Sequence, residues 1–488
     1  MDTKYIISRS LLVISLLMPC STVLAITEAG EVRYSRGVLT GQKGNESPRI
    51  IGKGMPLHNG ETLNTGSSGF AVIKLKDGSR MTLRPNTSFK IVNVDVREGK
   101  ENAFLKLFRG GFRAITGFIS KKSKDAFRVN TSVATIGIRG TEFDARLCEG
   151  TECDTENKAT GKKAENESKV IGRIALLRGR ASAQDLNNKS RPLRTGAAVY
   201  EQDELQTGIR SFAVVAFNDK SRVTMSPSSA FKIEEHRYKP KVPDENNAFL
   251  RFVRGGLRFI TGAIGKLNRK SYRVATPTAT IGIRGTGFDL VCEGECVDNQ
   301  ASLNPLRESV VSRLMNYFLK PVFAQSSSGM FASVWTGAIE IQFQGGKLLL
   351  ENGKAAFMRN GFSKPVVIPN LPVHLRNMGG APRPDTVNVK DDLFSAADQK
   401  DIDPGLYVSV RDGDVEVRGN DGTSTSLGKG EASVSGFSGK TLRLNFVPPF
   451  QKFDSIPVPS DVTPKMEKMV NLFGEKGQQK KEFECRLQ

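Results

Sequence analysis

The sequence ATIGIRGTEFD at Ala134–Asp144 returns almost unchanged as ATIGIRGTGFD at Ala279–Asp289. In the first copy, Ile136 and Ile138 belong to an apolar series at every second position, which is typical of a half-buried β-strand. Gly140 interrupts this series, and a glycine inside a strand indicates a bulge or the close approach of another backbone. We call this phrase the hallmark motif. We interpret it as a folding element, because it contains no paired nucleophile and base.

A bulge at Gly140 predicts where the neighbouring side chains point. Thr141 and Phe143 return to the core, whereas Arg139 lies on the outer face at the kink, with Asp144 close enough in sequence to be its ion partner. The candidate positions are Gly137, Arg139, Gly140, Thr141, Phe143 and Asp144 in the first copy, and Gly282, Arg284, Gly285, Thr286, Phe288 and Asp289 in the second.

The motif resembles the hallmark of the FecR-domain family, which comprises bacterial envelope proteins named after a periplasmic iron-citrate signalling regulator. The resemblance extends upstream through FLKLFRGGFRAITGFI and FLRFVRGGLRFITGAI and covers roughly Gly30–Cys148 and Ile174–Cys292. It implies an all-β periplasmic module, often solenoid-like, and it does not imply an enzyme. In the regulators of this family, a cytoplasmic helical domain and a membrane helix precede the β module and restrain a sigma factor. The only long apolar run here is a signal peptide, so we expect periplasmic sensing rather than direct sigma-factor control.

Length and charge restrict the classes of protein and partner. A chain of 488 residues predicts two to four domains. The formal net charge of +20 favours acidic partners, or serves only to keep the protein soluble. Basic and acidic residues are interspersed and no aromatic–basic RNA-binding motif is present, so no nucleic-acid partner is expected.

The N-terminus predicts export. Lys4 and Arg9 precede the apolar run Leu11–Leu17, and Val23 and Ala25 place small residues before a cleavage site. We therefore expect a mature protein that starts near residue 26 and is periplasmic or secreted. No later run reaches the roughly 18 apolar residues of a membrane helix, so no transmembrane span is expected.

The cysteines fit an oxidising compartment. Cys148 and Cys153 flank a glycine turn just beyond the first hallmark motif, and Cys292 and Cys296 do the same beyond the second. Such pairs predict two short-range disulfides. Zinc is the alternative, but it needs four ligands and no histidine lies near either pair. Cys485 has no predicted partner.

Both copies contain a predicted hairpin and several short strands that end in glycine. The hairpin strands are expected at Phe70–Leu75 and Arg80–Leu83, and again at Phe212–Phe217 and Arg222–Met225. Strand–glycine–strand cassettes recur throughout the chain, for example SVWTGAIEI from residue 333 and SVRDGDVEV from residue 409. These repeats predict an all-β fold of tandem β-solenoid or β-roll modules, with a sandwich as the alternative.

Each copy also carries a basic loop between the RGG stretch and the hallmark motif. The two loops are candidate binding surfaces for an anionic partner, or else a solvated face. Their cations are Lys121, Lys122, Lys124 and Arg128 in the first copy, and Lys266, Arg269, Lys270 and Arg273 in the second.

Two helices are expected outside the β modules. Leu306, Val310, Leu314 and Phe318 recur every four residues, which predicts an inserted amphipathic helix that docks on the β body or lies at a membrane surface. The predicted divisions are a signal peptide at 1–25, repeat 1 at 26–153, a polar linker at 154–170, repeat 2 at 171–296, a helical insertion and hinge at 297–330, a β cassette completing or extending repeat 2 at 331–374, a linker at 375–403, a C-terminal β cassette at 404–450, and a proline-rich segment with a C-terminal helix at 451–488.

The sequence contains no common nucleotide-binding, zinc-protease or hydrolase motif. We therefore predict a protein without enzymatic activity, cofactor or metal, which mediates protein–protein interaction or sensing in the cell envelope. The alternative is an envelope scaffold that binds an anionic cell-wall polymer, such as polysaccharide or peptidoglycan, through the basic loops. The sequence does not indicate the oligomeric state.

Overall fold

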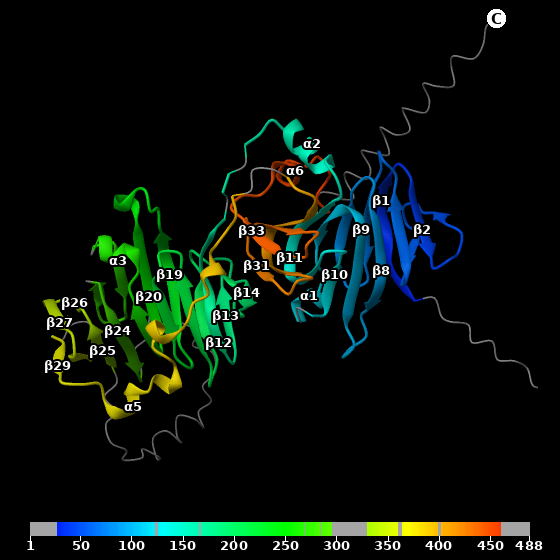
Figure 1. Cartoon of the computed structure of the whole chain (residues 1–488). Helices are drawn as coiled ribbons and strands as arrows, with labels where there is room; N and C mark the ends of the chain where they lie inside the picture. Colours follow the sequence, from blue (N-terminus) through cyan, green and yellow to red (C-terminus); the bar gives the residue numbers. More distant parts are fainter. Residues whose placement is uncertain are drawn as a thin grey trace, which may run out of the picture.

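The strands form two β bodies that lie side by side (Figure 1). The computed structural model describes residues 27–122, 125–163, 165–166, 168–268, 270–283, 285–294, 329–359, 364–398 and 402–459. We call the body built from strands β1–β11 and β30–β33 domain 1, and the body built from β12–β29 domain 2.

Domain 1 is two β layers around one apolar core. Leu63 and Phe89 point into the core from one layer and Met81 and Phe143 from the other, and none of the four has exposed surface. The elements are β1 (Glu28–Arg36), β2 (Leu39–Lys43), β3 (Arg49–Ile50), β4 (Pro56–His58), β5 (Glu61–Thr65), β6 (Phe70–Leu75), β7 (Arg80–Leu83), β8 (Ser88–Asp95), β9 (Asn102–Ile115), α1 (Ile119–Lys122), β10 (Phe127–Asn130), β11 (Ala134–Cys148), α2 (Glu152–Ala159), β30 (Gly405–Gly419), β31 (Ser424–Leu427), β32 (Ala432–Gly436), β33 (Thr441–Leu444) and α6 (Pro449–Lys452).

Domain 2 repeats this plan with two separate nine-stranded sheets that share one core. The alternation of the strands explains the burial, since the even and odd side chains of each strand point to opposite faces. The elements are β12 (Val170–Arg178), β13 (Ala181–Gln184), β14 (Ser190–Pro192), β15 (Ala198–Tyr200), β16 (Glu204–Thr207), β17 (Phe212–Phe217), β18 (Arg222–Met225), β19 (Ala230–Arg237), η1 (Pro243–Glu245), β20 (Asn247–Arg254), β21 (Gly256–Ile260), α3 (Ala263–Leu267), β22 (Tyr272–Ala275), β23 (Thr280–Ile283), β24 (Gly287–Glu293), β25 (Gly329–Thr336), β26 (Ala338–Phe343), β27 (Gly346–Glu351), β28 (Ala355–Met358), β29 (Val366–Ile368), α5 (Val373–Arg376), η3 (Met378–Gly380), η4 (Pro384–Thr386) and η5 (Asp391–Leu393).

A glycine bends each long strand from one layer into the other. Gly110 in the middle of β9 has a φ of +80°, and a Cβ added there would lie 2.5 Å from Thr87 Oγ1. Only glycine adopts this left-handed conformation without steric cost. Gly255 has a φ of +84° at the corresponding place in domain 2, where it separates β20 from β21.

The two domains are nested rather than consecutive. β30 pairs antiparallel with β11 over nearly its whole length, from Ala134 opposite Gly419 to Cys148 opposite Gly405. The C-terminal cassette therefore completes domain 1, and domain 2 is inserted between β11 and β30. Within domain 2, β24 pairs with β25, and β23 with β26, in the same manner.

The all-β class is confirmed, but no solenoid is found among the described residues. Neighbouring strands pair antiparallel except at β9–β10, β20–β22 and one isolated bridge. The predicted linker at 154–170 begins inside helix α2, which contacts α6. The amphipathic helix expected within 297–330 and the C-terminal helix expected after residue 463 lie outside the described residues. None of the helices that the structure describes is long and apolar enough to cross a membrane.

A buried ion network joins the two domains. Arg173 of β12 is 1% exposed and donates to Glu431, which lies between β31 and β32 in domain 1. Arg443 of β33 lies 3.7 Å from the other carboxylate oxygen of Glu431. Burial and the charge of Arg173 lower the pKa of Arg443 to about 10, against the opposing charge of Glu431. The single carboxylate therefore holds two buried guanidinium groups in place across the domain boundary.

We expect Glu431→Gln to destabilise the docking of the two domains, because it leaves two buried arginines without their counter-charge. Removing one partner of a buried ion pair costs about 3–5 kcal/mol. Denaturant unfolding of the full chain measures this loss. The matched control is Glu31→Gln, whose ion pair with Arg33 is exposed and is worth at most about 1 kcal/mol. Equal effects of the two substitutions would contradict the assigned role of Glu431.

Candidate functional site

The hallmark motif of domain 1 forms the bend in β11. Gly140 has a φ of +59°, and the register with β30 shifts directly after Arg139. Thr141 supplies hydrogen bonds where the regular pairing of β11 with β30 is interrupted. Its N–H donates to Thr116 Oγ1 at 2.9 Å, and its hydroxyl donates to the carbonyl of Asp414 at 2.9 Å. The motif thus satisfies its own backbone at the bend. The corresponding residues of domain 2 are Gly285, Thr286, Thr261 and Ala338.

The remaining motif positions are structural or lie outside the described residues. Phe143 and Phe288 have no exposed surface and pack in the two cores. Gly137 and Gly282 lie within strands, each opposite an arginine of the preceding strand. Arg284 is outside the described residues.

Asp144 does not pair with Arg139, which corrects the expectation from the sequence. It is 5% exposed and accepts hydrogen bonds from Arg113 Nε at 2.8 Å and Arg411 Nε at 2.7 Å. Arg139 lies before the bend at Gly140, whereas Asp144 lies after it, opposite Arg113 of β9. The bend therefore places the two side chains in different surroundings.

Asp289 has the equivalent position in domain 2. Arg258 donates to it at 3.2 Å, and the indole Nε1 of Trp335 donates at 3.1 Å from the position that Arg411 occupies in domain 1. Burial raises the pKa of Asp289, and the charge of Arg258 opposes this shift. The guanidinium of Arg383 lies over the Trp335 ring, 3.8 Å from its centroid.

The arginine partners of these aspartates also fix the segments that follow each cassette. Arg113 donates to the carbonyls of Gln451 and Ile456, and Arg258 donates to the carbonyl of Ala381 at 2.9 Å. Sequence reasoning missed both arginines. The sequence does contain a signal for this pairing, because the arginine precedes the aspartate by the same 31 residues in each copy.

The basic loop of domain 1 lies beside the bend. Lys121 and Lys122 are exposed on α1, and Lys122 pairs with Glu101. Arg128 is half-buried, with its guanidinium 5.7 Å from the centroid of the Phe104 ring. Two of these predicted cations are therefore already engaged within the domain.

The basic loop of domain 2 has a similar arrangement. Lys266 and Lys270 are exposed, and the Arg273 guanidinium lies 5.2 Å from the centroid of the Phe249 ring. None of these three cations lines the large cleft described below. The loop residues outside the described part of the chain are Lys124 and Arg269.

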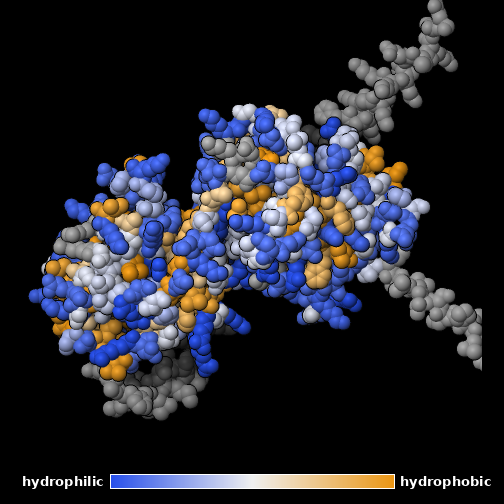
Figure 2. Space-filling view, viewed as in Figure 1, coloured by the Kyte–Doolittle hydropathy of each residue, from blue (hydrophilic) through white to orange (hydrophobic). Residues whose placement is uncertain are grey.

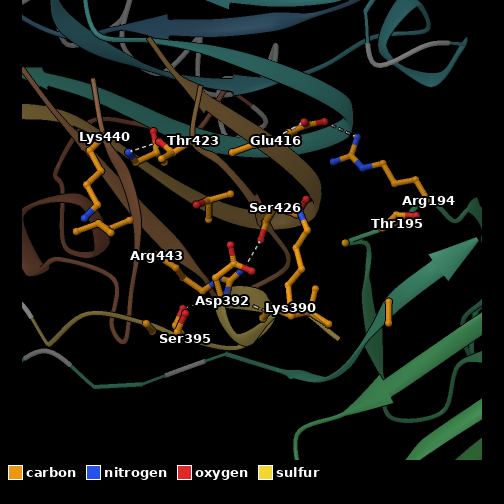
Figure 3. Close-up of a pocket in the computed structure, with 18 of the residues that line it drawn as sticks. Arg194, Thr195, Lys390, Asp392, Ser395, Glu416, Thr423, Ser426, Lys440 and Arg443 are labelled. Atoms are coloured by element: carbon orange, nitrogen blue, oxygen red, sulfur yellow. Dashed lines mark hydrogen bonds and ion pairs between the residues drawn. The ribbon is translucent and has the colours of Figure 1, made fainter. Parts of the chain in front are cut away.

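A cleft of about 1030 Å³ lies where the domains meet (Figure 3). Domain 1, the β12–β15 region of domain 2 and the segment between the domains at 388–397 all contribute to its lining. Its cationic residues are Lys122, Arg139, Arg194, Lys390, Lys440 and Arg443, and its acidic residues are Asp125, Asp392 and Glu416.

The cleft brings together predicted and unpredicted residues. Lys122 and Arg139 were predicted, whereas Arg194, Lys390 and Lys440 were not. No local pattern could have identified the last three, since their proximity depends on how domain 2 docks on domain 1.

Arg443 shapes one wall of the cleft rather than offering a free charge. Its guanidinium donates to the carbonyls of Leu393 at 3.1 Å, Ser395 at 3.2 Å and Ser426 at 2.9 Å (Figure 3). These bonds fix the 388–397 segment against the C-terminal cassette.

The first predicted disulfide is present. Cys148 at the end of β11 is bonded to Cys153 in α2. Cys292 is also disulfide-bonded, and both its predicted partner Cys296 and Cys485 lie outside the described residues.

One histidine is enclosed beside a carboxylate in the core of domain 2. His236 Nε2 lies 3.5 Å from Asp219 Oδ1, and neither side chain is more than 1% exposed. Burial would raise the pKa of Asp219, but the adjacent His236 and the hydrogen bonds from Ser221 outweigh it and lower the pKa. Among the described residues, no three His, Cys, Asp or Glu side chains gather as a metal site.

The match to a known protein family occurs twice, as the sequence repeat does. The FecR protein family matches residues 61–157 and 203–303, one stretch in each domain. The chain therefore carries two FecR-type repeats. No curated protein matches it.

Two crystal structures of one protein, a proposed anti-sigma factor from Parabacteroides distasonis, are similar in structure to part of this chain. The overlap covers 34% of this chain and 59% of the other, at 12% identity and a TM-score of 0.23. The chain thus spans less than two thirds of that protein, and so distant an overlap assigns no activity.

The bend itself generates a prediction for the first FecR domain. Gly140→Val forces a β-branched residue to a φ of +59° and should lower the free energy of unfolding by about 2 kcal/mol or more. An added Cβ meets only Lys121 Cγ at 3.7 Å, so the cost arises from the backbone. Arg139→Ala, one residue away, should change stability by no more than about 0.5 kcal/mol. Parallel denaturant melts compare them, and a larger loss for Arg139→Ala would place that side chain in the fold rather than in the cleft.

The second prediction concerns acid stability. The lowered pKa of Asp219 stabilises the fold above its ordinary value of 3.8, and this contribution is lost as the pH falls through the folded pKa. In the first domain, burial raises the pKa of the corresponding Asp77. His236→Val should therefore raise the pKa of Asp219 and flatten the acid limb of stability against pH. Unfolding midpoints at a series of acidic pH values measure this slope, and an unchanged slope would contradict the assignment.

Proposed function

We propose that this FecR-domain protein is a non-catalytic binding protein of the cell envelope, which recognises an acidic partner protein in the cleft between its two domains. The observation that carries the proposal is the composition of the cleft, in which six cationic side chains face three acidic ones. An excess of one charge in a concave site concentrates ligands of the opposite charge and speeds their association.

The envelope location is supported by several features. The N-terminal sequence has the pattern of a signal peptide, the FecR family is associated with the envelope, and the Cys148–Cys153 disulfide suits an oxidising compartment. Hydrophilic residues cover most of the face shown in Figure 2, with hydrophobic residues in smaller patches.

The cleft favours binding over catalysis. Its lining contains arginine, lysine, serine and threonine side chains and three carboxylates. These groups recognise an anionic partner by charge and hydrogen bonding. Because the Arg173–Glu431–Arg443 network holds the domains together, the partner meets a preformed surface.

A second function is an envelope scaffold that holds an anionic cell-wall polymer. The observation in its favour is that exposed Lys121 and Lys122 extend the positive charge of the cleft along α1. Such binding would be distributed over many weak contacts and would collapse as salt screens them, with a Debye length of about 10 Å at 0.1 M.

The test is capture from a detergent-free envelope extract and, in parallel, binding to purified cell-wall sacculi, each over a series of salt concentrations. Exchanging Lys390 and Lys440 for Glu should weaken partner capture at least about tenfold, which corresponds to about 1.4 kcal/mol. The control exchanges Lys266 and Lys270, which carry the same charge but do not line the cleft. Capture of one protein that is weakened by the Lys390 and Lys440 exchange, and not by the control exchange, supports the proposal. Salt-sensitive binding to sacculi, with equal effects of both pairs, would favour the scaffold.

A further inference from the structure

Two arginines from different domains converge in the cleft. Arg139 belongs to the hallmark motif at the bend of β11, and Arg194 follows β14 in domain 2. Thr195 lies beside Arg194 in the lining (Figure 3). The cleft holds this pair only when the domains are docked.

Each arginine has buried guanidinium nitrogens that lack an acceptor. Arg139 Nε and both terminal nitrogens of Arg194 have almost no exposed surface and no hydrogen-bond partner. Buried donors in folded proteins are nearly always satisfied, and an arginine offers five of them in a planar fork. The orphaned donors therefore indicate a position for an acceptor that the chain itself does not supply.

The nearby carboxylates do not fill this position. Glu416 Oε2 forms an ion pair with Arg194 at 3.9 Å (Figure 3), a distance that is too long for a hydrogen bond and leaves the terminal nitrogens of Arg194 without an acceptor. The other oxygen of Glu416 accepts from Arg418 at 3.2 Å and Ser424 at 2.9 Å. Asp414 attracts Arg139 electrostatically, but no ion pair joins Arg139 to a carboxylate of the described residues.

The two positive charges also act on each other. Burial and then the charge of Arg194 lower the pKa of Arg139, and the charge of Asp414 opposes both. Two like charges held close in a partly buried site repel, and an anion placed between them relieves that repulsion. Lys390 and Lys440, which are exposed in the same lining, add to the attraction.

We propose that Arg139 and Arg194 form a seat for one oxyanion group, a carboxylate or a phosphate, that both domains bind together. The inference rests on the proposed function, because this group would be the part of the acidic partner that enters the cleft. Guanidinium forks match the paired oxygens of carboxylates and phosphates, whereas an ammonium does not. The hallmark arginine of the first FecR domain thus binds ligand, while the rest of the motif folds the strand.

The test uses the full chain with inorganic phosphate and with acetate as separate probes, measured by isothermal titration calorimetry. Wild-type protein should bind at least one probe, and Arg139→Ala and Arg194→Ala should each weaken binding at least about tenfold. Arg139→Lys, which retains the charge without the fork, should lie between them and wild type. Arg36→Ala, an exposed arginine of β1 outside the cleft, is the matched control and should bind as wild type does.

The outcomes separate this seat from the proposed function. No binding of either probe by folded wild-type protein overturns the seat, even if envelope capture still depends on Lys390 and Lys440. Binding that survives both arginine substitutions means an adventitious ion only, and also overturns it. If probe binding requires both arginines but no protein is captured from the envelope extract, the seat is supported and only the proposal of a protein partner is contradicted. A preference for phosphate or acetate identifies the source of the oxyanion.

Discussion

The left-handed glycines at the bends are the constraint on which the rest of the structure depends. A strand that must serve both layers has to fold over within one or two residues, and a side chain at that point would meet its own backbone. Neighbouring bends also touch. A Cβ on Gly413 would lie 2.6 Å from the carbonyl oxygen of Gly140, and one on Gly337 would lie 2.6 Å from that of Gly285. A cassette can therefore complete a domain only if its strand carries a glycine at the position that lies beside the bend of the neighbouring strand.

This constraint explains why most residues of the hallmark motif stabilise the fold whereas Arg139 lines the cleft. The bend shifts the alternation by one residue, so Thr141 and Phe143 after it turn inward, whereas Asp144 points to the opposite face and binds Arg113 there. The residues after the bend have the same structural role in both domains, because Thr141 and Thr286 make equivalent bonds and Asp144 and Asp289 hold equivalent arginines. Arg139 does not have this structural role, and its surroundings depend on which part of the chain docks against the bend.

Local pattern predicted much of the fold and little of the site. The hairpin strands at Phe70–Leu75 and Arg80–Leu83 have the predicted bounds, since alternation and turn residues are both local signals. The pairing of β11 with β30 was not predicted, because periodicity shows which face of a strand is buried but not which distant edge completes it. The cleft depends on that pairing and on the docking of the domains, so its unpredicted cations Arg194, Lys390 and Lys440 carry no signal in their own neighbourhoods. The domain boundaries and the roles of the basic loops remain predictions.

Nesting gives the cleft a property that two consecutive domains would lack. The chain enters domain 2 after β11 and returns before β30, so two connections and the buried Glu431 network restrict how the domains can move. A single flexible linker would leave a ligand to order the domains as it binds, at a cost in free energy that reduces affinity. With the domains already docked, Arg139 and Arg194 line the same cleft before any ligand arrives. If an anion binds between them as proposed, their mutual repulsion has already been offset during folding, so the anion can gain from relieving it.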